Sequence, residues 1–387
     1  MEKRSMAPST PVNRYRVILN SSGARLPEKV RLDLNFQEPN SADTRAMIEN
    51  RLEKGPEDVL VPVGLRYMVE VSAIALDEAL SKAIALSDGI TSFISLSERL
   101  GLPPPLQEIA YDISPGINER AFLQLFHNLP VDLPRKAIDP EFLMFSLRKV
   151  IEEKDERRRD RISRGVRWYR KGALSIDVFD KFISYWTGLE ALNPLLQNEV
   201  NSADQAEDTI QTVSGIKAFM QKFYPGDLYK RAHELRVELI HSTKPLVALT
   251  SEASSLEVVM GEVLRRSIYF LLGSEIQQGD EVEARSATAP AVTMGFEGII
   301  HGTQPNELGP PGEQPHLEVT RHEVISTKVE DPKIERTVTS TFTARTREGV
   351  SITLFGWRLY GPKGATGELH AVKVTPEGDK QPRQESR

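Results

Sequence analysis

The stretch that decides the fold is DVFDKFISYWTGLEAL, residues 177–192. Its large apolar side chains recur every three or four residues, which is the spacing of one face of a helix. These side chains are Phe179, Phe182, Tyr185, Trp186 and Leu189. A helix with so broad an apolar face needs other helices to cover it, so the stretch predicts the inside of a helical bundle.

The sequence on both sides of this stretch, from 136 to 280, is also helical in pattern. Breakers such as Pro225-Gly226 and Pro245 separate the expected helices, which lie within 140–170, 214–223, 227–241 and 251–273. Short links make neighbouring helices antiparallel. Section 136–280 therefore predicts an all-α domain.

Outside this section the pattern changes to that of strands. Residues 13–135 mix alternating apolar runs with a helical stretch after Asp77, which predicts a small α/β domain. From 289 to 377 the apolar period is two, as in an antiparallel sheet with one solvated face. The expected fold class is multidomain α+β, with a small N-terminal α/β domain, a central helical bundle and a C-terminal antiparallel β domain. Flexible tails are expected at 1–12 and 378–387.

Length and composition exclude several classes of protein and site. The 387 residues are too many for one ordinary core. The chain has no cysteine, which excludes disulfides, zinc ribbons, iron–sulfur clusters and thiol nucleophiles. A net charge of −6 argues against a globally basic nucleic-acid-binding protein, although a local basic patch stays open. We expect a cytoplasmic protein with no membrane partner, because the sequence shows no signal peptide and no run of about 20 apolar residues.

The histidines do not predict a metal site. Of the seven, only His233 and His241 share an expected helix. Eight residues place them about two turns apart, which is too far to bind one metal ion. We therefore expect neither a metal nor another cofactor.

Arg236 and His241 lie on the expected helix 227–241, and together they suit RNA cleavage. A histidine can take the proton of a ribose 2′-hydroxyl or give one to the leaving 5′-oxygen, and an arginine can stabilise charge on the phosphorane. Five residues turn through about 140° of helix, so the two side chains do not share one face, although they can still converge on one substrate at the C-terminus of the helix. A second copy related by a two-fold axis would bring two arginines and two histidines into one cleft. The spacing alone also fits a surface arginine and a helix-terminal histidine.

The sequence around this pair resembles the ApeA-like branch of the HEPN superfamily. In that branch an Arg-Trp-Tyr-Arg run precedes a helix of the form Phe-x-x-Tyr-Trp-x-x-Leu-Glu-Ala-Leu, and Leu-Arg-x-x-x-x-His follows. The three pieces occur here in the same order, at 167–170, 182–192 and 235–241. The resemblance covers residues 150–273.

The resemblance implies a helical bundle that forms a homodimer and acts as a metal-independent endoribonuclease, in defence against phage or in stress responses. By matched position Arg236 and His241 would be the catalytic pair, acting on single-stranded RNA, and Glu190 could hold an arginine from inside the bundle. Active members commonly have a small polar residue after the arginine, where this chain has Val237. A non-catalytic module that binds RNA or a protein is therefore an alternative, and a plain structural dimer with its function elsewhere is a third.

The basic run 157–171 supplies further candidates for RNA contact. Arg164 and Arg167 could follow an RNA backbone, and His233 lies one turn before Arg236. The alternative is a solvated helix whose arginines pair with the acidic residues at 152–156. The aromatic residues Trp168, Tyr185 and Trp186 are expected in the core rather than as stacking platforms.

Overall fold

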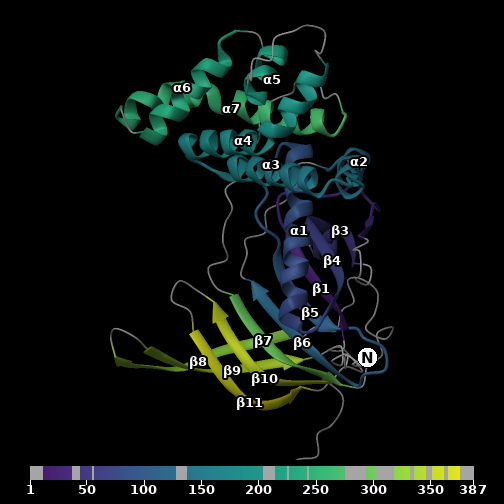
Figure 1. Ribbon diagram of the computed structural model, residues 1–387. Coiled ribbons are helices and arrows are strands. Elements are labelled where there is room, and N and C mark those ends of the chain that lie inside the picture. Colours follow the sequence, from purple (N-terminus) through teal and green to yellow (C-terminus); the bar gives the residue numbers. More distant parts are fainter. Residues whose placement is uncertain are drawn as a thin grey trace, which may run out of the picture.

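The fold combines helices and strands, as the expected α+β class requires. The computed structural model describes residues 12–36, 44–54, 56–127, 137–203, 214–224, 226–241, 244–274, 293–301, 318–331, 335–345, 351–360 and 365–374. Helices gather at one end of the molecule and strands at the other, with the long helix α1 (Leu76–Glu98) running between them (Figure 1).

Nine strands of the described chain form one antiparallel sheet, in the order β11-β10-β7-β6-β5-β1-β4-β3-β2. They are β1 (Asn13–Ser21), β2 (Leu32–Phe36), β3 (Thr44–Lys54), β4 (Leu60–Ala73), β5 (Leu106–Asp112), β6 (Glu119–His127), β7 (Thr293–His301), β10 (Ser351–Tyr360) and β11 (Ala365–Val374). Strands β8 (Glu318–Asp331) and β9 (Glu335–Arg345) pair with each other in a separate antiparallel ribbon.

This sheet crosses the boundary that we expected between an N-terminal domain, 13–135, and a C-terminal β domain, 289–377. β6 pairs with β7 along its whole length, from Glu119 opposite His301 to His127 opposite Thr293. The two strand-rich regions therefore share one sheet. Alternation along a sequence identifies residues of a strand, but it does not identify the neighbouring strand. Apart from Val12, the tails expected at 1–12 and 378–387 lie outside the described residues.

Six helices follow in the section where we expected the bundle. They are α2 (Pro140–Ile151), α3 (Glu156–Leu174), α4 (Val178–Ala203), α5 (Gly215–Phe223), α6 (Leu228–His241) and α7 (Leu246–Leu271). The expected helical section 140–170 is divided, because Asp155 caps a new helix. Its carboxylate accepts hydrogen bonds from the backbone N–H groups of Arg157 and Arg158, at 2.9 and 3.3 Å.

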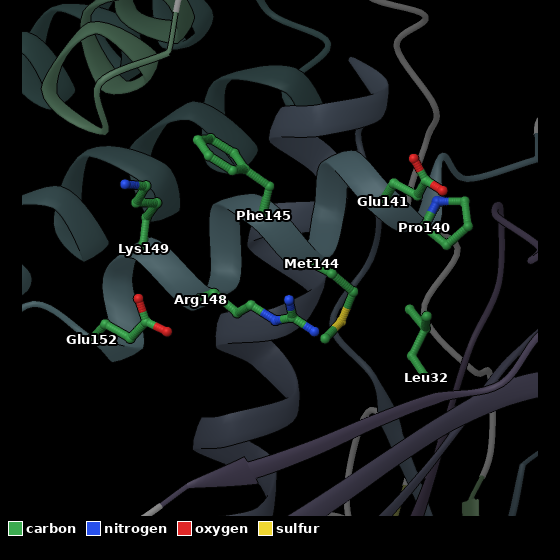
Figure 2. Close-up of a pocket in the computed structure, with 8 residues that line it drawn as sticks. All are labelled: Leu32, Pro140, Glu141, Met144, Phe145, Arg148, Lys149 and Glu152. Atoms are coloured by element: carbon green, nitrogen blue, oxygen red, sulfur yellow. The ribbon is translucent and has the colours of Figure 1, made fainter.

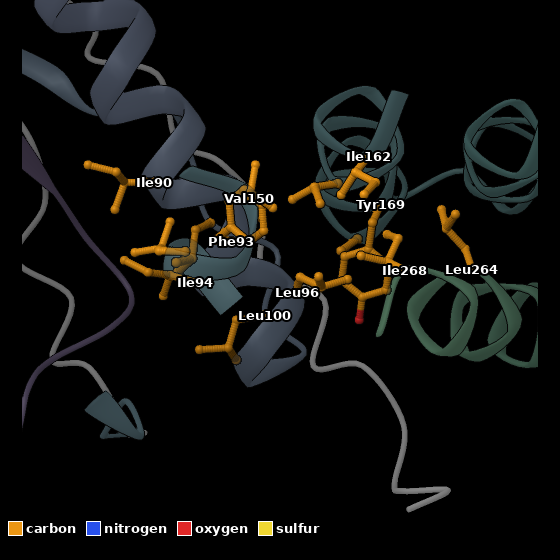
Figure 3. Close-up of a cluster of buried hydrophobic side chains, with 14 of the residues drawn as sticks. Ile90, Phe93, Ile94, Leu96, Leu100, Val150, Ile162, Tyr169, Leu264 and Ile268 are labelled. Atoms are coloured by element: carbon orange, nitrogen blue, oxygen red, sulfur yellow. The ribbon is translucent and has the colours of Figure 1, made fainter. Parts of the chain in front are cut away.

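The helices and the N-terminal strands share one hydrophobic core. α1 packs on β1, β4 and β5 and also against α2 and α3. Figure 3 shows Ile90, Phe93 and Ile94 of α1 close to Val150 of α2, with Ile162 and Tyr169 of α3 beyond them. A second cluster lies on the other face of the sheet and joins Ile18, Met68, Phe122, Phe296 and Ile352. The expected domain boundary near 135 is therefore bridged by a continuous core.

Two buried arginines fix α1 to the bundle. Arg170 of α3 donates to the backbone carbonyl of Leu102 at 2.7 Å and to Oδ1 of Asp88 on α1 at 2.6 Å. Arg265 of α7 donates to the carbonyl of Leu96 at 3.1 Å. Such hydrogen-bonded burial makes Arg170 a structural residue rather than part of an exposed basic surface.

Candidate active site on helix α6

Helix α6 carries Arg236, His241 and His233. It begins after Gly226, whose φ of +105° is a conformation that glycine adopts readily. Ala232 and Leu235 are buried and face the bundle, where α6 packs against α4, α5 and α7. Arg231 ties α6 to α7, donating to Oε1 of Glu252 at 2.9 Å and to the hydroxyl of Ser255 at 3.0 Å. The helix is thus held at the edge of the bundle.

Arg236 is held by Glu190 of α4. One guanidinium nitrogen of Arg236 lies 3.1 Å from Oε1 of Glu190, and the indole N–H of Trp186 donates to the same oxygen at 2.8 Å. The Arg236 side chain is 30% exposed and that of Glu190 43% exposed, so the pair lies at the rim of the bundle. The Nε atom of Arg236 is buried and has no hydrogen-bond acceptor among the described residues. Because 30% of the Arg236 side chain is exposed, water or a ligand can still reach the guanidinium through its other nitrogens.

The two histidines of α6 are exposed. His241 is the last residue of the helix. His233 stacks on Tyr229, with ring centroids 5.7 Å apart, and its edge meets Trp186 at 6.2 Å. The aromatic contacts fix the ring of His233 on the same side of α6 as Glu190.

Arg236 and His241 point to different sides of α6. At about 100° per residue they are about 140° apart around the helix, and the surface between them holds His233, Val237 and Ile240. This agrees with their environments, since Arg236 reaches Glu190 and His241 faces solvent. Within one chain the two side chains therefore leave α6 from different faces.

Uncovered apolar side chains adjoin His241. Ile240 precedes it on α6, and Leu246 and Val247 open α7 with 60% and 84% of their surface exposed. Lys244, between the two helices, pairs with Glu238 of α6 at 3.2 Å and so fixes the corner. Exposed large apolar side chains that gather in one region are typical of a surface that another molecule covers.

Arg164 and Arg167 lie elsewhere. Both are exposed on α3 and line a groove of about 770 Å³ whose other walls are α1 and α2, and which includes no residue of α6. Arg164 pairs with Asp160 at 2.8 Å. The structure thus brings His233 and Arg236 together and places the two α3 arginines in a second site. The sequence did not indicate the groove, because we expected α1 to belong to a separate domain.

A smaller hollow of about 610 Å³ lies between α2 and Leu32 at the start of β2. Figure 2 shows Met144, Phe145, Arg148 and Lys149 projecting from α2 along it. The ammonium of Lys149 lies over the Phe145 ring at 5.7 Å, a contact that needs no ligand. Among the described residues no group of three or more His, Asp or Glu side chains could hold a metal ion.

No model of a known protein family matches the sequence, and no curated protein or solved structure is detectably similar to the chain. None of the helices described here has both the length and the apolar character that crossing a bilayer requires.

Proposed function

We propose that this protein is a metal-independent endoribonuclease that cuts single-stranded RNA as a homodimer, with Arg236 and His241 at its active site. The observation that carries the proposal is the placement of the pair on α6. Arg236 is reachable at the rim, His241 is exposed, and the apolar residues beside His241 are uncovered. The HEPN resemblance implies a role in phage defence or in stress responses, and the lack of a signal peptide in the sequence favours the cytoplasm.

The proposed chemistry needs groups that one chain holds apart. An imidazole removes the proton of the ribose 2′-hydroxyl, whose oxygen attacks the adjacent phosphorus, and the imidazolium then returns that proton to the 5′-oxygen as it leaves. A guanidinium stabilises the charge on the phosphorane. Because Arg236 and His241 lie on different sides of α6, we propose that the arginine of one copy acts with the histidine of the other. Contact between the two copies would cover Ile240, Leu246 and Val247.

Glu190 has a positioning role in this proposal. Its carboxylate fixes the Arg236 side chain, and Trp186 fixes the carboxylate. A phosphate group that enters the cleft can then accept from N–H groups of the same guanidinium that Glu190 does not use, since a guanidinium has five. Arg164 and Arg167 are not included in this site, since they line the groove on α3.

The test is RNA cleavage by the purified protein in EDTA. We expect products that end in a 2′,3′-cyclic phosphate or a 3′-phosphate, and a loss of about a hundredfold or more in His241→Ala and Arg236→Ala. Lys230→Ala is the matched control, because Lys230 is an exposed cation on the same helix with only a long contact of 4.0 Å to Glu234. Undiminished cleavage by His241→Ala would remove that residue from the site.

One observation favours a second function, a non-catalytic module that binds RNA or a protein. The carboxylate of Glu190 already balances the charge of Arg236, and the apolar Val237 lies on the strip between Arg236 and His241. This module would bind RNA or its partner without turnover. Arg236→Ala would then weaken binding, whereas His241→Ala would leave it unchanged.

A further inference from the structure

The groove between α1, α2 and α3 combines an apolar floor with a basic rim. Its floor is aliphatic for the most part and includes Leu86, Ile90, Val150 and Ile151. Figure 3 shows two of these, Ile90 and Val150, where α1 meets α2. The volume of about 770 Å³ lies within the range of roughly 300–1,000 Å³ that is usual for small-molecule sites.

Gly89 keeps the α1 wall of this groove open. It lies in the middle of α1, where glycine costs about 1 kcal/mol of helix stability relative to alanine. No packing contact demands it, since a Cβ at this position would meet nothing within 4 Å. Its neighbour Ala85, one turn earlier, also lines the groove with a small side chain. Small residues along this wall leave space above the floor.

The rim carries an excess of positive charge. Four arginines line the groove (Arg157, Arg159, Arg164 and Arg167), against two carboxylates, Glu156 and Asp160. Asp160 pairs with Arg164, but the guanidinium groups of Arg157 and Arg167 form no ion pair with any residue in the described part of the chain. An anionic group at this rim would therefore meet cations that are free to bind it.

We infer that this groove binds a small amphiphile that has an anionic head and an aliphatic chain. The arginines would take a phosphate or carboxylate head, and the chain would lie on Leu86 and Ile151, which are both partly exposed. The floor fits an aliphatic chain better than the bases of RNA, which bind by stacking on exposed rings. Aliphatic side chains outnumber aromatic ones along this groove, where Phe36 and Phe93 are the aromatic residues. This inference is independent of the proposed site on α6.

The test is calorimetric titration of the full chain with dodecyl phosphate and with dodecanoate, each below its micelle concentration. We expect saturable binding of at least one, and the tighter of the two identifies the head group. Three control ligands each lack one feature. Inorganic phosphate has the anionic head without the chain, dodecanol has the chain without the charge, and dodecyltrimethylammonium has the chain with the opposite charge. We expect each of these to bind at least about tenfold more weakly, because each lacks one of the two recognised features.

Variants of the wall and the rim locate the binding. Gly89→Leu fills the groove from a position without neighbours, and Arg167→Gln removes a free cation, so each should raise Kd about tenfold or more. Ser81→Leu, at an exposed position of α1 outside the groove, and Arg14→Gln, on β1, are the matched controls and should leave Kd unchanged. If Gly89→Leu does not fold, Ala85→Leu on the same wall replaces it.

Three results would overturn the inference. The first is no saturable binding of either anionic amphiphile. The second is binding that Gly89→Leu and Ala85→Leu leave intact, which would place the ligand elsewhere. The third is binding of oligouridylate that competes with the amphiphile and is lost in the wall variants, which would make the groove an RNA site.

Discussion

Glu190 links Trp186 of α4 with Arg236 of α6 through a single carboxylate oxygen. The sequence predicted that Glu190 could hold an arginine, because it lies in the Tyr-Trp-x-x-Leu-Glu motif. It did not predict that the pair lies at the rim, 30% and 43% exposed, since exposure depends on where α6 packs against α4. A pair so exposed contributes at most about 1 kcal/mol to stability. The role that we propose for this pair is to hold the Arg236 side chain in position.

Substitution of Glu190 tests that role. We expect Glu190→Ala to lower RNA cleavage by about ten- to a hundredfold, because an unheld Arg236 is displaced from the phosphorane. Glu190→Gln keeps an oxygen that can accept from both partners and should restore most of the rate. The free energy of unfolding, measured in urea, should change by less than about 1 kcal/mol in either variant. Equal rates in Glu190→Ala and the wild type would contradict a positioning role.

Gly101 and Gly89 have opposite surroundings, so alanine substitutions at the two positions should change the free energy of unfolding in opposite directions. A Cβ on Gly101 would lie 2.3 Å from the backbone oxygen of Ala173, whereas a Cβ on Gly89 would meet nothing within 4 Å. Gly101→Ala should therefore lower the free energy of unfolding by about 1–3 kcal/mol, because backbone must move. Gly89→Ala should raise it by up to about 1 kcal/mol. Urea denaturation of both variants checks the signs, and a stable Gly101→Ala would show that α3 does not pack this closely on the loop after α1.

At the scale of elements, α1 connects the sheet with the bundle, and Arg170 secures it. Its guanidinium donates to Leu102, Asp88 and Ser92, and the residue is only 5% exposed. The sequence predicted the helix containing Arg170 but not its burial, because an arginine within a basic run gives no sign of its partners. Arg164 and Arg167, on the same helix, are exposed.

Arg170→Met should therefore destabilise the protein by about 3 kcal/mol, since it leaves the Leu102 carbonyl without its buried donor and removes the pair with Asp88. Arg164→Met, which breaks only an exposed pair on the same helix, should cost less than about 0.5 kcal/mol. Urea denaturation followed by circular dichroism measures both. Equal losses in the two variants would contradict the role of Arg170.

At the end of β6, burial lowers the pKa of the His127 imidazole below its ordinary value of 6.5, although the hydrogen bond to the backbone carbonyl of Gln107 acts in the opposite direction. Between the lowered pKa and 6.5 the unfolded chain binds more protons than the folded one, so stability falls as the pH drops below 6.5. His127→Gln should lose this part of the pH dependence. Urea denaturation at several pH values checks it, and identical pH profiles for both proteins would contradict the burial of His127.

At the scale of the whole molecule, the sequence predicted the helices and strands better than it predicted how they pack together. Periodicity indicated the helices of 136–280 and the strands on both sides. It did not reveal that β6 pairs with β7, or that one core runs from β1 through α1 to α7, because these contacts join residues far apart in the sequence. The sequence did not predict the groove on α3 for the same reason, because its walls come from both sides of an expected domain boundary.

The continuous core predicts that the bundle is not an independent unit. A fragment of residues 137–274 would expose the surfaces of α2 and α3 that pack on α1. We expect this fragment to unfold without a sharp transition, and the full chain to lose its helical circular dichroism and the fluorescence of its three tryptophans together. A fragment that unfolds as cooperatively as the full chain would show that the domain boundary expected from the sequence, near 135, is real.

Subunit complementation tests whether two copies of the chain share one active site. Arg236→Ala and His241→Ala proteins are each assayed alone on single-stranded RNA in EDTA, then mixed under conditions that exchange subunits. If the site joins Arg236 of one copy with His241 of the other, random exchange gives half heterodimers with one intact site of two, and about a quarter of wild-type activity returns. Activity that stays at the level of the separate variants, in a mixture shown to contain heterodimers, would contradict a site shared between two copies.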